Sequence, residues 1–169
     1  MARKQGIEIL VEAARLLQDR DDLAFVICGE GPNRLELEKL AAGLTNIQLH
    51  DLQPAEKMGA MLTMANIHLL PQIAGAADLV LPSKLTNMLA SARPVVATTE
   101  PGTGLYDEVD GCGTVTPPGD AKALAAAITA LADDPERCAV LGTAARERAE
   151  QRWMKDAIID RVVAELEKL

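Results

Sequence analysis

A hydroxyl, an ammonium group and a carboxamide lie together at the start of one predicted helix. Residues 80–96 read VLPSKLTNMLASARPVV, in which Pro-Ser-Lys introduces the helix and Arg-Pro ends it. Ser83 and Asn87 share one face of that helix because they are four residues apart, and Lys84 adjoins Ser83. A helix N-terminus attracts anions through its unpaired N–H groups and its dipole. These side chains would therefore suit a diphosphate. The alternative is that Ser83 is a local cap and Lys84 a solvated charge.

A glycine-rich turn is the second candidate for ligand binding. Gly29-Glu30-Gly31-Pro32 follows an apolar run and leads into a polar-faced helix. Glycines let a ligand approach the backbone closely, and the helix that follows favours an anion. The motif is weak alone, since it lacks the third glycine of a dinucleotide fingerprint. A plain tight turn explains it equally well.

Residue types that carry nucleophilic or metal chemistry are sparse. His50 and His68 have no partner at metal-ligand spacing, so we expect both to be structural. Cys28, Cys112 and Cys138 have no CxxC or CxxH spacing, which favours free thiols in a reducing compartment. No Ser-His-Asp, Cys-His or HExxH arrangement can be assembled. The sequence therefore predicts neither a catalytic residue nor a metal site.

Strands alternate with helices along most of the chain. Apolar runs predict strands at 23–29, 47–50, 67–70, 94–98 and 113–115, and helices at 5–18, 33–43, 54–65, 83–92 and 102–109. Further helices are expected at 121–132, with Asp120 as its N-cap, and at 135–152 and 154–168, whose Arg and Glu residues indicate solvated, salt-bridged faces. This alternation is typical of an α/β, Rossmann-like, three-layer αβα fold with a parallel sheet. We expect residues 1–169 to form one domain.

Ligands of such folds bind beyond the carboxyl ends of the strands. The loops expected at that edge are 29–32, 50–54, 72–82 and 98–104.

Composition excludes several classes of function. The net charge is −8 and the chain has one Phe, one Tyr and one Trp, so non-specific nucleic-acid binding through basic patches and stacking aromatics is not expected. No signal peptide or membrane span is evident, because the longest apolar runs have the length of strands. We expect a cytoplasmic protein.

Six stretches, taken in order, resemble the C-terminal half of family-4 retaining glycosyltransferases of the GT-B fold. They are KQGIEILVEAARLL, FVICGEGPNRLELEKLA, NIQLHDLQPAEKMGAMLTMANIHLLP, SKLTNMLASARPVVATT, GLYDEVDGCGTVTPPGDAKALAAAI and LADDPERCAVLGTAARERAEQRW. They cover almost the whole chain, and their order is far more specific than any single motif. The PSKLTN variant is most similar to bacterial exopolysaccharide transferases of the colanic-acid type.

The resemblance implies a binding site for a UDP-sugar or GDP-sugar donor, without a metal or other cofactor. In the family, two glutamates separated by seven residues mark this site, and the second holds the ribose. Their positions correspond to Leu79 and Asn87, so both acids are absent, and Asp78 is one position away. Asn87 can still bond ribose hydroxyls, but without the roughly twofold strength of a charge-assisted bond.

The resemblance also implies roles for three loops. The family's phosphate-binding Lys-Gly pair falls at Gln5-Gly6, where Lys4 is adjacent, and Lys4 or Lys84 would supply the charge. The nucleotide base would lie against the backbone around Leu52. Gly29 and Gly31 would line the same cleft.

The resemblance further implies that this chain is half of an enzyme. The family's N-terminal domain, which holds the acceptor site, would be absent, and so would the first strand of the C-terminal domain, since Met1 aligns just past it. We therefore expect a domain that is inactive alone and that leaves strand edges unpaired, which would favour self-association. Any peripheral membrane contact would be made by the missing part.

Two other functions are compatible with the sequence. A sugar-nucleotide 2-epimerase shares the GT-B halves, but it would need catalytic acids and a histidine that we cannot assign. A non-catalytic binding or interaction module of the same fold would explain the missing acidic pair.

Overall fold

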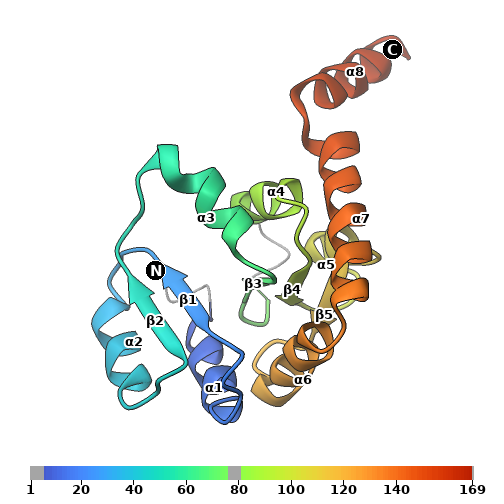
Figure 1. Ribbon diagram of the computed structural model, residues 1–169. Coiled ribbons are helices and arrows are strands. Elements are labelled where there is room, and N and C mark those ends of the chain that lie inside the picture. Colours follow the sequence, from blue (N-terminus) through green and yellow to red (C-terminus); the bar gives the residue numbers. More distant parts are fainter. Residues whose placement is uncertain (1–5, 76–80, 169) are drawn as a thin grey trace.

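A computed structural model describes residues 6–75 and 81–168 (Figure 1). Its helices are α1 (Glu8–Leu16), α2 (Arg34–Ala41), the 3-10 turn η2 (Ala55–Lys57), α3 (Met58–Met64), α4 (Ser83–Ala90), α5 (Gly104–Val109), α6 (Ala121–Ala132), α7 (Pro135–Trp153) and α8 (Lys155–Leu166). Its strands are β1 (Phe25–Cys28), β2 (Ile47–His50), β3 (His68–Leu70), β4 (Val95–Thr98) and β5 (Gly113–Thr116). The α/β fold class with parallel strands is confirmed, and the element boundaries differ from the prediction by a few residues at most.

The strands form two parallel sheets rather than one. β1 pairs with β2, while β3, β4 and β5 form the second sheet in that order. Among the described residues, β1 and β3 each have one edge without a neighbouring strand.

Helices cover both faces of the second sheet, and β4 is therefore buried on both sides. Its residues alternate between two cores: Val96 packs with α1 and α6, whereas Val95 and Ala97 pack with α4, α5 and α7. All three side chains are fully buried. Alternation of this kind makes β4 the middle of the expected three layers.

Side chains satisfy backbone groups at several helix ends. Asp120 accepts a hydrogen bond from the N–H of Ala123 at 2.9 Å, which confirms the predicted cap of α6. Arg146 donates to the carbonyl of Ala90 at the end of α4, and also pairs with Glu150 as the helical spacing predicts. Arg148 donates to the α5 carbonyls of Asp107 and Glu108 and to that of Asp110.

His68 has the structural role that the sequence predicts. It is buried in β3, and its Nε2 lies 2.8 Å from Ser91 Oγ. Ser91 Oγ donates its proton to the carbonyl of Met88, so Nε2 of the neutral imidazole is the donor to Ser91. Burial, with a smaller contribution from the Arg93 charge, lowers the pKa of His68 to about 4. The bond fixes the end of α4 against the sheet.

Within the described residues, no helix is long and apolar enough to cross a membrane.

Candidate functional site

The polar residues of the first candidate group lie on the exposed side of α4. Leu85 and Leu89 anchor the helix and are fully buried, while Ser83, Lys84 and Asn87 are exposed. Ser83 is the first helical residue and does not cap the helix with its side chain. No hydrogen bond or ion pair holds these polar side chains in the described part of the chain. They are therefore free to meet a ligand.

The glycine-rich turn follows β1 and leads into α2, beside the end of β2. Gly29 and Gly31 have φ values of 145° and 146°, a conformation that favours glycine. The N–H of Gly29 donates to the carbonyl of His50 at 3.0 Å, which extends the pairing of the two strands into the turn. Leu52 follows β2 with 66% of its surface exposed.

Arg34 holds the turn after β1 and the loop after β2 in position, a role that the sequence did not predict. Its Nη1 donates to the carbonyls of Gly29 (2.9 Å) and His50 (2.7 Å). Its Nη2 donates to the carbonyl of Leu49 at 3.3 Å, and its Nε pairs with Glu38 at 2.7 Å. These carbonyls lie just after β1 and at the end of β2, so one guanidinium sets the spacing of the two loops that the family resemblance assigns to the nucleotide. No sequence motif marks an arginine after a Gly-rich turn as a residue that binds loop carbonyls.

A hydroxyl joins β4 to the loop after β3. Thr98 Oγ1 accepts from the N–H of Gln72 and donates to the carbonyl of the same residue, both at 2.8 Å. The side-chain oxygen of Gln72 is buried without a partner. This loop packs tightly against Gly6, where a Cβ would come within 3.0 Å of Ile73 and φ is +58°. Both features favour glycine at position 6.

Lys4, Gln5, Asp78 and Leu79 lie outside the described residues. Among the rest, Gly29, Gly31 and Leu52 follow the two-stranded sheet, and Ser83, Lys84 and Asn87 follow the three-stranded sheet. No hydrogen bond joins the two groups in the described segments. Nor does any cluster of three or more His, Cys, Asp or Glu there form a potential metal site.

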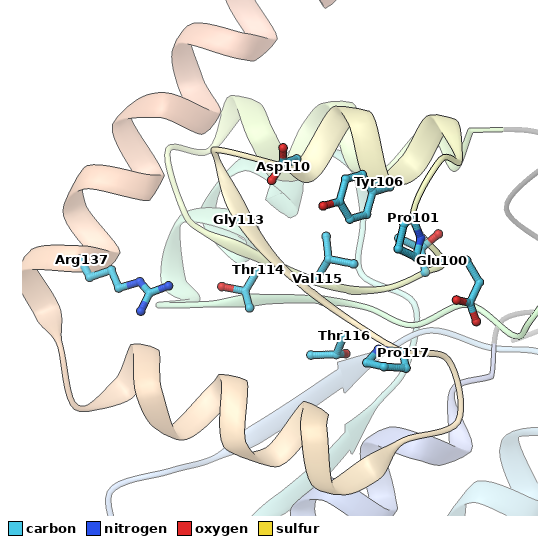
Figure 2. Close-up of a pocket in the computed structure, with 11 residues that line it drawn as sticks. Glu100, Pro101, Tyr106, Asp110, Gly113, Thr114, Val115, Thr116, Pro117 and Arg137 are labelled. Carbon is cyan, nitrogen blue, oxygen red and sulfur yellow. The ribbon is translucent and has the colours of Figure 1, made fainter.

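An open hollow of about 340 Å³ lies elsewhere, along β5 (Figure 2). Tyr106 of α5 and Arg137 of α7 line it together with the strand itself. It shares the Thr99–Pro101 loop with the carboxyl edge of the sheet but includes none of the predicted site residues. We give greater weight to the carboxyl edge as a ligand site, because the hollow follows the side of an edge strand rather than the ends of several strands.

Comparison with protein families gives one match that covers most of the chain. The family described as glycosyl transferases group 1 matches residues 1–134. The Escherichia coli (strain K12) protein WcaI, named as a colanic acid biosynthesis glycosyl transferase, is 37% identical over 171 residues. That alignment covers 98% of this chain and 41% of WcaI. The chain thus spans about two fifths of that relative's length.

Solved structures share the fold at low sequence identity. Anabaena HepE in complex with UDP-glucose superimposes with a TM-score of 0.81 and 19% identity, covering 100% of this chain and 47% of HepE. Sucrose-phosphate synthase from Thermosynechococcus elongatus gives a TM-score of 0.78 and 23% identity, covering 99% of this chain and 43% of the synthase.

Proposed function

The chain belongs to the group 1 glycosyl transferases and has their Rossmann-like GT-B fold, and from that premise we propose that it is the nucleotide-sugar-binding half of a retaining enzyme of bacterial polysaccharide biosynthesis. The observation that carries the proposal is the alignment with WcaI, which covers nearly all of this chain but only 41% of the relative. The likeness to HepE, whose structure contains UDP-glucose, supports a nucleotide-sugar donor.

The donor diphosphate binds at the N-terminus of α4 in this proposal. Ser83 offers a hydroxyl and Lys84 an ammonium group, and both are exposed without a partner in the described structure. The helix dipole contributes roughly 0.3–1 kcal/mol to the binding of an anion there. The family resemblance assigns a phosphate-binding role to the Gln5-Gly6 position, and Gly6 packs against the loop after β3.

The nucleoside binds across the loops after β1, β2 and β3. Leu52 and the turn at Gly29 and Gly31 receive the base, and Arg34 holds their backbones in position. Asn87, one turn into α4, bonds the ribose hydroxyls with its amide. An amide in place of a carboxylate weakens this contact, and it also favours a second candidate, a non-catalytic nucleotide-binding module of the same fold.

The acceptor site and the reacting groups belong to a second domain, and the chain alone is inactive. Exposed apolar surface supports this part of the proposal. Ile158, Ile159, Val162 and Val163 of α8 are between 40% and 54% exposed, on a helix that extends away from the rest of the chain (Figure 1). Apolar surface of this kind commonly marks a protein contact. The free thiols fit a cytoplasmic location, where thiols stay reduced.

Chemical-shift mapping of the ¹⁵N-labelled chain with UDP and with GDP tests the location. The proposal predicts shifts at Ser83, Lys84 and Asn87 and at the turn around Gly29. Shifts confined to the hollow along β5, or no shifts at millimolar nucleotide, would contradict it.

A further inference from the structure

β5 ends its sheet, and no strand among the described residues lies at its outer edge. The carbonyl of Thr116 accepts from the N–H of Thr99 at 3.0 Å, so the backbone groups of Thr116 point toward β4. Successive residues of a strand direct their backbone groups to opposite edges. The N–H and C=O of Val115 therefore point outward, into the hollow along β5. The edge has hydrogen-bonding groups in place for another strand.

Two opposite charges lie at opposite ends of this edge. Figure 2 looks onto β5, with Arg137 beyond the Gly113 end and Glu100 beyond the Pro117 end. Both side chains are exposed, and neither forms a hydrogen bond or ion pair within the described residues. The edge is therefore positive at its Gly113 end and negative at its Pro117 end.

We propose that β5 pairs antiparallel with β5 of a second copy of this chain, so that the two three-stranded sheets join about a two-fold axis. In antiparallel pairing the first residue of one strand faces the last residue of the other. A two-fold axis that is perpendicular to the sheet and lies beside the middle of β5 therefore brings Arg137 of each copy toward Glu100 of the other copy. The same edge serves both copies, which is the property of a two-fold interface.

Charge complementarity identifies a second copy as the occupant. The two-fold operation creates two Arg–Glu pairs at once. Asp110, the other acidic residue of the hollow, lies above β5 on the α5 side in Figure 2. Because the two-fold axis is perpendicular to the sheet, Asp110 of the other copy lies on this same α5 side, away from the strand-to-strand seam. The N–H and C=O groups of Val115 supply the backbone bonds between the two strands.

Sedimentation equilibrium with charge reversals tests the interface. At about 150 mM salt, where the Debye length is about 8 Å, the repulsion between two copies of net charge −8 is partly screened. We expect a reversible dimer. Glu100→Arg and Arg137→Glu should each weaken it by roughly tenfold, because each replaces two attractive pairs with two repulsive ones. The double variant should restore the dimer, since both pairs are then reversed.

A matched control and a second readout separate this interface from others. Glu147→Arg makes the same charge change as Glu100→Arg at an exposed site on α7 and should leave the dimer unchanged. The amide of Val115 should exchange with solvent more slowly as protein concentration rises. A chain that stays monomeric, or a dimer that is indifferent to both single reversals, overturns the proposal. So does a double variant that is no better than the single variants. Association through the open edges of β1 or β3 would give the indifferent result.

Discussion

Nη1 of Arg34 lies 2.7 Å from the carbonyl oxygen of His50, and this contact joins the helix after β1 to the end of β2. The same nitrogen donates to the carbonyl of Gly29. Because a guanidinium is planar and always charged, it holds two loop backbones at a fixed spacing. The proposed base-binding loops thus have their geometry set by a residue outside the site itself.

Removing the Arg34 side chain should loosen both loops. In Arg34→Ala, the carbonyls of Gly29 and Leu49 lose the Arg34 donor, and that of His50 keeps only the N–H of Gly29. We expect the free energy of unfolding to fall by roughly 1–3 kcal/mol. Urea denaturation measures this change. Glu38→Gln is the matched control, since it alters only the exposed ion pair and should cost less than about 1 kcal/mol. Equal stability of Arg34→Ala and the wild type would contradict this role.

Lys84→Ala should weaken the binding of UDP or GDP at least several-fold, because it removes a positive charge from the proposed diphosphate site. Titration calorimetry gives the affinity. Lys39→Ala, an exposed lysine on α2, is the control and should bind as the wild type does. Unchanged affinity in Lys84→Ala would remove this lysine from the site.

Asn87→Glu should strengthen binding of a nucleoside diphosphate relative to that of the free base. A carboxylate can accept from both ribose hydroxyls, whereas the amide offers one acceptor oxygen. Calorimetry of UDP and of uracil with both proteins gives the comparison. Weaker UDP binding by the variant would mean that the surroundings of Asn87 suit another ligand.

His68 should make stability depend on pH between about 6.5 and 4. Burial lowers its pKa to about 4 in the folded protein, from the ordinary histidine value of 6.5. The unfolded chain therefore binds more protons in this interval, and the stability contributed by neutral His68 is complete above pH 6.5 and is lost as pH falls toward 4. The denaturation midpoint should depend less on pH in His68→Gln than in the wild type. The exposed His50, in His50→Gln, provides the control; similar curves for both variants would argue against this assignment.

The open edges of β1 and β3 should limit the stability of this chain. Buried unpaired backbone groups cost roughly 1–3 kcal/mol each, against a typical domain stability of roughly 5–15 kcal/mol. We predict a broad melt and poor solubility of residues 1–169, whether or not the β5 dimer forms. Thermal melting and solubility measurements test this. A sharp, reversible melt of the soluble 169-residue chain would be evidence against this prediction.

Local sequence signals predicted the elements well. β2 and α6 have the predicted bounds, and Asp120 caps α6 as expected, because these features depend on neighbours a few residues away. The polar residues of α4 are exposed beside a buried Leu85–Leu89 stripe, as their spacing indicates.

Long-range contacts could not be predicted in the same way. Arg34 binds carbonyls up to 16 residues away, and Thr98 binds Gln72 across 26 residues. The Arg and Glu residues of α7 indicated salt bridges along that helix, yet Arg148 donates to carbonyls about 40 residues away. No spacing rule reports such partners, since they depend on how the layers pack.

Titration calorimetry of this chain with UDP, GDP, UDP-glucose and GDP-mannose tests the central claim most directly. If the chain is the donor-binding half of a glycosyltransferase, at least one nucleotide should bind with one-to-one stoichiometry, and Lys84→Ala should weaken that binding. Absence of heat with all four compounds at millimolar concentration, from a chain shown to be folded by circular dichroism, would contradict the account.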